Sequence, residues 1–291
     1  MSDTARKELS YQKTGYLDED FKLFYITDQN QKSFDYHYHD FHKILIFLQG
    51  NVSYAIEGKQ YDLKPQDIIL VQAGEIHRPV IHDASLYERI IIYVSPAFFE
   101  TYQQEGHDLF QCFSNASHQN SGLIRPEASS SSNSARIKAA GLSSICQELA
   151  ASFHDKSFAA PLYQKTKFME FLILLNRIVL DDPFCYTEAI TSNPAVQKII
   201  KYINDHISED ALSVDSIAAA VFLNRSYLMH LFKEETGHTI GKYISEKRLF
   251  LARNYLMKGM SVTDACFYSG FKNYSAFYYA YKHKYGTSPK N

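Results

Sequence analysis

The sequence predicts an α+β multidomain protein. An amino-terminal β-barrel or double-sheet jelly roll is followed by a helical segment, and then by an all-α domain with two helix-turn-helix motifs. Three observations predict this class: short apolar segments between turn residues in the first hundred residues, helical apolar stripes in the middle, and one residue pattern that occurs twice near the end. The expected domains are residues 1–120, 121–182 and 194–291.

The composition is that of an ordinary folded protein, because 45% of the 291 residues are hydrophobic and 21% are charged. The first residues lack the pattern of a secretory signal, and no apolar run is long enough to span a bilayer. Four scattered cysteines have no paired spacing, as expected of reduced thiols. We therefore expect a cytoplasmic protein that makes no membrane contact.

The net charge of −2 is unevenly distributed. From Pro194 onward the chain has 13 Lys and Arg against 8 Asp and Glu, whereas the preceding residues have 17 basic and 24 acidic side chains. A basic module attached to an acidic body favours a carboxy-terminal end that binds a polyanion.

Short strands are predicted between Phe21 and Tyr93. The near-continuous apolar run Lys43–Leu48 is typical of a strand covered on both faces. Val52–Ile56 alternates as a strand facing a core does, and Ile68–Val71 and Arg89–Val94 are further apolar strands. Turn residues at roughly eight- to twelve-residue spacing favour a small β-barrel or a double-sheet jelly roll.

Helical patterns follow the strands. Pro96–Gln119 is predicted to be helical and to cap the barrel, and the polar run Ser129–Ser134 is interpreted as a flexible joint. Two apolar stripes come next, from Ile137 to Phe153 and from Leu162 to Val179. Such stripes have to be buried, either on the barrel or on a second copy of the chain. Asp181–Asn193 is the predicted interdomain linker.

One pattern occurs twice after Ser213, at an offset of 49 residues, so that Asn224 matches Asn273 and Gly237 matches Gly286. Each copy has a polar cap, a short helix, a tight connection and a second helix that ends at a glycine. The two second helices are predicted at Arg225–Thr236 and Tyr274–Tyr285. Two helices that meet across a short turn are typical of a helix-turn-helix, whose second helix enters the major groove of DNA.

Two more helices complete this domain. Pro194–Ser208 has an apolar side and begins with proline, which suits the first helical position. Ile240–Met257 lies between the two motifs, and a helix of 18 residues is about 27 Å long. With its flanking turns it could hold two recognition helices about one DNA turn, roughly 34 Å, apart. The chain is therefore expected to read two successive major-groove segments.

These residues resemble the AraC-type transcription regulators. Leu223–Leu228 with Leu231–Gly237 resembles the first reading helix of that family, and the second signature is matched by Gly270, Phe271, Ser275, Phe277, Lys282, Gly286, Ser288 and Pro289. The resemblance covers about the last hundred residues. It implies a regulator that binds double-stranded promoter DNA in a sequence-specific manner, more often an activator than a repressor, with RNA polymerase as a partner if it activates.

The residues expected to contact DNA are Arg225, Ser226, Met229, His230 and Lys233 in the first copy, and Tyr274, Ser275, Tyr278, Tyr279 and Lys282 in the second. By the family pattern Ser226, Met229 and His230 occupy base-reading positions. Arg225 and Lys233 are expected to meet phosphate. Many relatives have arginine where Tyr279 lies, and its absence removes a bidentate contact to guanine.

The amino-terminal part resembles the cupin barrel that many AraC-type regulators carry. The residues that carry this resemblance are His37, His39, Gly50, Pro65, Asp67 and Gly74–His77. In metal-binding cupins a glutamate usually follows the paired histidines by four or five residues, where this chain has Lys43 and Ile44. A cation at Lys43 opposes a divalent metal.

Three interpretations of these histidines remain open. They hold a small polar effector, with a carbohydrate as the class that the resemblance favours; they bind a metal; or they are packed barrel residues. The first is the leading hypothesis, without a metal or cofactor, and its effector-binding residues are His37, His39, Lys43, Tyr54 and His77. His42 and His82 are expected to be exposed or in turns.

The leading hypothesis is therefore an effector-controlled, DNA-binding regulator, with a homodimer formed through the helices after the barrel as the resemblance implies. No catalytic residue is expected, because no nucleophile elbow, phosphate loop or pair of acid and base carboxylates is evident. The alternatives are a metal-dependent cupin enzyme fused to a DNA-binding module, and an effector-independent regulator controlled by a protein partner.

Overall fold

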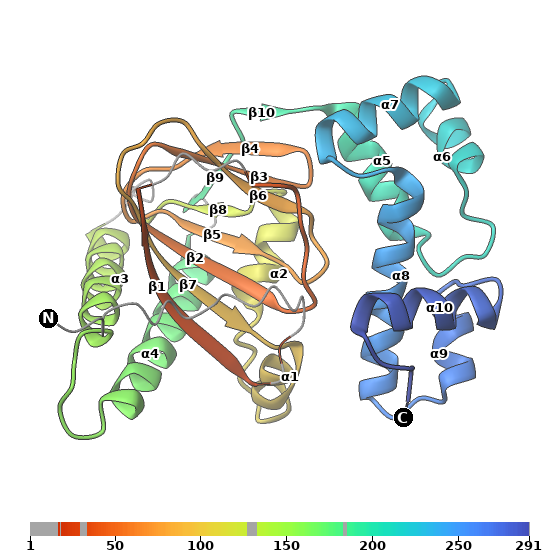
Figure 1. Ribbon diagram of the computed structural model, residues 1–291. Helices are drawn as coiled ribbons and strands as arrows, with labels where there is room; N and C mark the ends of the chain where they lie inside the picture. Colours follow the sequence, from red (N-terminus) through yellow and green to blue (C-terminus); the bar gives the residue numbers. More distant parts are fainter. Residues whose placement is uncertain (1–16, 18, 30–33, 127–132, 183–184, 291) are drawn as a thin grey trace, which may run out of the picture.

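The computed structural model describes residues 17, 19–29, 34–126, 133–182 and 185–290. A β-rich part and a helical part lie side by side, and the chain passes from one to the other through the segment that contains β10 (Figure 1). No helix among these residues is long and apolar enough to cross a membrane.

The β-rich part is built from two antiparallel sheets. The order in the six-stranded sheet is β1-β7-β2-β5-β8-β9, and the order in the four-stranded sheet is β10-β4-β3-β6. The strands are β1 (Phe21–Asp28), β2 (His42–Gln49), β3 (Val52–Ile56), β4 (Lys59–Asp62), β5 (Ile68–Val71), β6 (His77–Ile81), β7 (Tyr87–Val94), β8 (Leu123–Ile124), β9 (Tyr186–Thr187) and β10 (Thr191–Ser192). The prediction of a double-sheet β domain is confirmed.

Strand β2 is apolar on both faces because each face packs against a different core. Successive side chains of a strand point to opposite faces. Ile44 and Ile46 therefore join the core under the helices, while Leu45 and Phe47 join the core that also contains Tyr54 of the four-stranded sheet. All four side chains are buried, as the run Lys43–Leu48 predicts.

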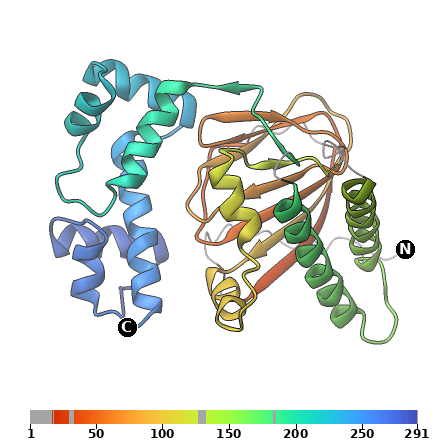
Figure 2. The same ribbon diagram turned by 180° about the vertical axis from the view of Figure 1, so that it is seen from behind.

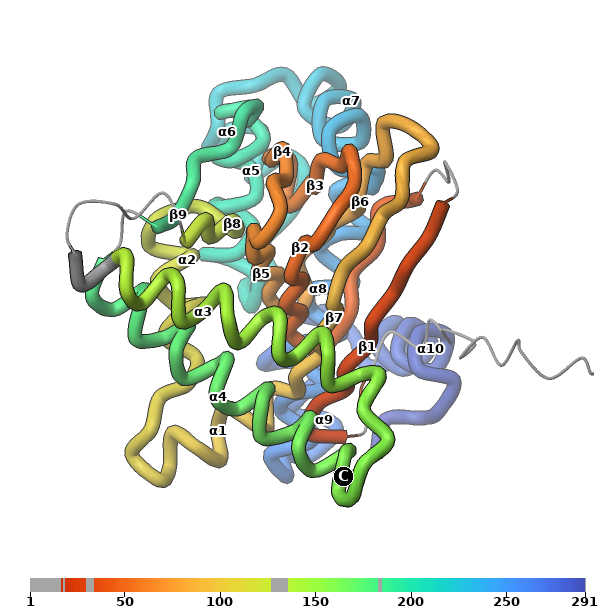
Figure 3. The backbone as a smooth tube through the Cα atoms, turned by 90° about the vertical axis from the view of Figure 1, so that its left-hand side faces the viewer, coloured from red at the N-terminus to blue at the C-terminus, as the bar shows by residue number. Residues whose placement is uncertain are grey.

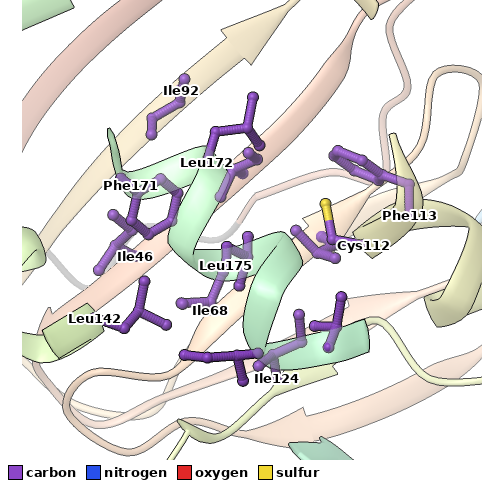
Figure 4. Packing of buried hydrophobic residues seen from close by; sticks show 14 of the residues in the cluster. Ile46, Ile68, Ile92, Cys112, Phe113, Ile124, Leu142, Phe171, Leu172 and Leu175 are labelled. Carbon is purple, nitrogen blue, oxygen red and sulfur yellow. The ribbon is translucent and has the colours of Figure 1, made fainter. Parts of the chain in front are cut away.

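Four helices cover the outer face of the six-stranded sheet. They are α1 (Pro96–Gln104), α2 (Gln111–His118), α3 (Asn133–Ser152) and α4 (Ala160–Asp181), and α3 and α4 lie side by side (Figure 3). Figure 4 shows Phe171, Leu172 and Leu175 of α4 among isoleucines of the sheet. Burial of each such side chain contributes about 1.5–3 kcal/mol.

Most of both predicted stripes is thus buried within the chain itself. Ile137 and Leu162 are exceptions, because they are 71% and 65% exposed. They lie in the first turns of α3 and α4, beyond the central turns that meet the sheet, so the sheet does not bury them and burial against a second copy of the chain stays a prediction. Of the predicted joint, residues 129–132 lie outside the described residues, and Asn133 and Ser134 begin α3.

The predicted linker has strand structure. Strand β9 pairs with β8, and β10 pairs with β4, so the segment after α4 contacts both sheets before the helical part begins. Residues 183–184 lie outside the described residues. Asn193 then caps the next helix by accepting hydrogen bonds from the backbone of Ala195 and Val196.

The helical part contains both predicted motifs. Its helices are α5 (Pro194–Asp205), α6 (Val214–Val221), α7 (Arg225–Thr236), α8 (Ile240–Met257), α9 (Val262–Tyr268) and α10 (Tyr274–Tyr285). Ser213 and Ser261 cap α6 and α9, and Asn224 and Asn273 cap α7 and α10. Helix α8 runs along both motifs (Figure 2), and each motif has its own apolar core.

Candidate functional site

The outward face of α7 carries the five residues predicted to contact DNA. Leu228, Leu231 and Phe232 are buried in the core of the first motif. The opposite side of the helix exposes Arg225, Ser226, Met229, His230 and Lys233. Arg225 forms an exposed ion pair with Asp215 of α6.

The outward face of α10 is formed largely by tyrosine. Tyr274, Ser275, Tyr279 and Lys282 are exposed, and Tyr278 is half-buried with its ring stacked on Tyr274 at 6.3 Å between centroids. Tyr281 and Tyr285 are buried in the core of the second motif. The exposed tyrosines offer both aromatic surface and hydroxyl groups to a partner.

Helix α8 determines the separation of these two faces. It has 18 residues, as expected from the sequence, and is therefore about 27 Å long. Helices α7 and α10 lie at opposite ends of it (Figure 1). This separation is of the order of one turn of DNA, roughly 34 Å.

Three histidines meet inside the β-rich part. His37 and His77 are joined by two backbone hydrogen bonds of 3.1 and 2.9 Å. Their ring centroids are 4.4 Å apart, and the ring of His39 lies 4.8 Å from that of His77. We call His37, His39 and His77 the histidine cluster.

Backbone carbonyls determine which ring nitrogen of His39 and His77 carries hydrogen. Nδ1 of His39 donates to the carbonyl oxygen of Phe41 at 2.6 Å, and Nδ1 of His77 donates to that of Glu75 at 3.0 Å. Burial, followed by the charge of Lys43, lowers both pKa values well below the ordinary range, so both rings are neutral. Nε2 of each is then a buried acceptor, and neither has a hydrogen-bond partner among the described residues.

Lys43 and Tyr54 lie beside the histidine cluster. The ammonium of Lys43 donates to the hydroxyl of Tyr54 at 2.8 Å, and the Tyr54 ring lies parallel to that of His77, with centroids 6.0 Å apart. Burial, then the charge of Arg89, lowers the pKa of Lys43 to about 7. The cluster therefore has both hydrogen-bond acceptors and a donor.

The surroundings of the histidines do not favour a metal. No group of three or more His, Cys, Asp or Glu among the described residues is arranged to hold a metal ion. The Lys43 side chain is buried next to the histidines, at the position where metal-binding cupins usually have a glutamate ligand. Its cationic form opposes a divalent ion there.

Comparisons with known proteins agree with this architecture. A family model described as an AraC-like ligand binding domain matches residues 22–172, which is more than half of the chain, and a model described as a helix-turn-helix domain matches residues 217–291. The chain belongs to the AraC-type transcription regulators. It is thus a DNA-binding regulator with an amino-terminal ligand-binding domain.

Similar proteins align with this chain over most of their length. HTH-type transcriptional activator RhaS of Klebsiella pneumoniae is 23% identical over 272 residues, covering 90% of this chain and 88% of the relative. RhaS of Citrobacter koseri is 24% identical over 273 residues, with the same coverage. A crystal structure of apo ToxT from Vibrio cholerae aligns with 94% of this AraC-type regulator and 96% of its own chain, at 16% identity and a TM-score of 0.38.

One expectation for the regulator's histidines is wrong. His42 was expected to be exposed or in a turn, but it is buried on β2 against Phe99, Phe110 and Phe113. Its Nδ1 accepts a hydrogen bond from the Ala73 amide, and burial lowers its pKa to about 3. The error arose because the apolar partners come from helices that are distant in sequence. His82 is exposed, as expected.

A cleft of about 750 Å³ lies between the two parts of the AraC-type regulator. Its lining includes Glu57, Lys59 and Glu75 from the β-rich part, and Gln197 and Lys247 from α5 and α8. None of the residues that line it belongs to the histidine cluster. Sequence reasoning missed this junction, because its members are single polar residues in unrelated segments.

Proposed function

We propose that this AraC-type regulator activates transcription when a small polyhydroxylated effector, such as a carbohydrate, occupies the histidine cluster. Residues 1–120 would bind the effector, residues 121–182 would form a homodimer, and residues 194–291 would bind promoter DNA. The protein would act in the cytoplasm by binding alone, without catalysis. An activator of this kind also requires RNA polymerase as a partner.

The proposal for DNA rests on the exposure of two reading faces. Ser226, Met229 and His230 lie on the free side of α7 in its first turns, where a recognition helix meets base edges. Lys233 and Lys282 lie in the last turns of α7 and α10, where they would pair with phosphate. The exposed Tyr274 and Tyr279 would contact thymine methyl groups or the backbone.

One observation carries the proposal for the effector. His39 and His77 each present a buried Nε2 that can accept a hydrogen bond, because Nδ1 of each ring donates to a carbonyl, and within the described part of the chain neither Nε2 has a partner. A hydroxyl group is the natural partner, since it donates to such a nitrogen and also accepts from Lys43. A carboxylate could accept from Lys43 but has no hydrogen for the two imidazoles. The relatives named as activators support the positive sign of regulation.

Exposed apolar residues on α3 and α4 support the homodimer. Ile137, Leu162, Tyr163, Ile173 and Leu180 are all at least one-third exposed. A second copy of the chain that packed its own α3 and α4 against these residues would bury them. Sedimentation of the purified chain tests this, because Leu162→Glu should convert a dimer to a monomer if the face is the interface.

A thermal-shift screen of the purified protein tests the effector. Aldoses and sugar alcohols should raise the melting temperature, and the matching sugar acids should raise it less. Saturation at a hundredfold excess over Kd would contribute about 2.7 kcal/mol. His39→Phe and His77→Phe should abolish the shift, whereas His82→Phe should retain it. A screen in which no polyol acts, or a shift that survives both cluster substitutions, would reject this site.

A further inference from the structure

The segment from Tyr36 to Phe41 has two faces with different contacts. His37, His39 and Phe41 face into the β-rich part, where the first two belong to the histidine cluster and Phe41 lies in the core between the sheets. Tyr36 and Tyr38, in contrast, pack against the helical part. This alternation has the period of two that is expected of an extended chain.

The outward side chains touch three helices of the DNA-binding part. The Tyr36 ring packs directly on Gly237, at the end of α7, where an added Cβ would come within 2.5 Å of it. The Tyr38 hydroxyl accepts a hydrogen bond of 2.7 Å from Lys284 of α10. Asp40 forms an ion pair with Arg253 of α8. One short segment therefore contacts both helix-turn-helix motifs and the helix between them.

The segment Glu75–His77, which pairs with Tyr36–Phe41, also has one side chain in the histidine cluster and another against the helical part. The ring of His77 lies in the cluster, whereas the preceding residue, Ile76, is 1% exposed within the core of the first motif. The amide of Ile76 donates to Oε1 of Glu57 at 2.9 Å, and Oε2 of Glu57 accepts from the hydroxyl of Tyr243 on α8 at 2.6 Å. The backbone bonds between His37 and His77 join the two segments.

From this arrangement we infer that the paired segments Tyr36–Asp40 and Glu75–His77 couple the histidine cluster to the orientation of the two DNA-reading motifs. A displacement of the His39 backbone also displaces that of Asp40, since the two residues share a peptide unit. The same holds for His77 and Ile76. The identity of the ligand that causes such a change rests on the proposed function, but the coupling does not.

The outward contacts are of a kind that does not shift gradually. The Asp40 and Arg253 side chains are 12% and 17% exposed, so separating them leaves two poorly solvated charges. Tyr36 has no space to move toward Gly237. Each of these contacts therefore resists small displacements, as a coupling element with discrete states requires.

Hydrogen exchange measured by mass spectrometry on the full-length chain tests the coupling without any effector. His39→Gln and His77→Gln keep a polar side chain but remove the imidazole. Each should accelerate amide exchange in α8 and α10 at least fivefold, and should leave α3 and α4 unchanged. His82→Gln, an exposed histidine of the same sheet region, is the matched control and should change neither pair of helices.

Asp40→Asn provides the second arm. Alone, it should accelerate exchange in α8 and α10. Combined with His39→Gln, it should give no further acceleration there, because the connection is already interrupted. Unchanged exchange in α8 and α10 for both histidine variants, equal acceleration in α3 and α4, or additive effects in the double variant would each overturn the inference. Failure of every polyol to bind would reject the proposed effector, but it would not affect the hydrogen-exchange test of the coupling, which needs no effector.

Discussion

Lys233 offers a quantitative test of how α7 meets DNA. It is exposed in the last turn of that helix, on the same side as Ser226 and His230, where we expect it to pair with one phosphate. Each phosphate contact contributes about 0.9 to the slope of log affinity against log salt, so a fourfold rise in salt costs about 3.5-fold in affinity for that contact. Over such a rise, the fold-loss of affinity of Lys233→Ala should therefore be about 3.5 times smaller than that of the native chain.

Fluorescence anisotropy with a labelled duplex, titrated at several salt concentrations, measures these slopes. Lys201→Ala is the matched control, since Lys201 is an exposed lysine on α5 that is paired with Asp205 and belongs to neither α7 nor α10. It should leave the slope unchanged. If Lys201→Ala reduced the slope as much as Lys233→Ala, overall charge and not a local phosphate contact would explain binding, and the assignment would be refuted.

Three further predictions concern specificity, capping and pH. His230→Ala should change the preferred sequence in a selection from random duplexes, with a loss of about 1–3 kcal/mol of discrimination at one position, and an unchanged preference would contradict its base-reading role. Ser261 accepts a hydrogen bond from the Asp264 amide, so Ser261→Ala should destabilise the chain by about 1 kcal/mol in denaturation followed by circular dichroism, whereas Thr263→Ala on the exposed side of α9 should not. Burial, then Glu57, raises the pKa of Glu75 from 4.5 to about 7, so its stabilising contribution is present below pH 4.5 and is lost as the pH rises through 7. The buried histidines have the opposite effect on the pH dependence of stability, so the quantity to measure is the difference in unfolding free energy between Glu75→Gln and the native chain. In urea denaturation the variant should gain stability relative to the native chain from pH 5 to pH 8. A difference that stays constant over this range would refute the assignment.

The helical part could be predicted closely because its signals are local. Capping residues such as Ser213 and Asn224 satisfy backbone groups within their own first turn, and glycines such as Gly237 end helices through their positive φ. Ends and spacing of α7, α8 and α10 therefore agree with expectation. The internal repeat strengthened each of these assignments, because the same signals occur at matching positions.

The junction between the two parts could not be predicted, because its contacts join distant segments. Nothing near Glu57 in the sequence indicates that its carboxylate meets Tyr243, which follows 186 residues later. The proximity of His37 and His77 was indicated only by the family resemblance, because no periodicity in the sequence joins the two residues. Its consequence, that the neighbours Tyr38 and Ile76 contact the DNA-binding part, becomes evident when both segments are seen together.

The packing of α3 and α4 shows a third kind of difficulty. An apolar stripe indicates that a helix face is buried, but it does not indicate which part of the protein covers that face. Here the central turns pack on the six-stranded sheet, while Ile137 and Leu162 remain exposed at the ends. A helix face that packs on a sheet and one that packs on a second copy of the chain favour the same apolar residues, so the sequence alone could not show which partner buries the face.

The central claim is that α7 and α10 of one chain enter consecutive major grooves. Hydroxyl-radical footprinting on a duplex selected from a random pool by the full-length protein tests it most directly. We expect two protected segments on one face of the duplex, with centres about 10 base pairs apart, and loss of one of them when Tyr274 and Tyr279 are both replaced by alanine. Failure to select any sequence, or a single protected segment that the double substitution leaves intact, would contradict it.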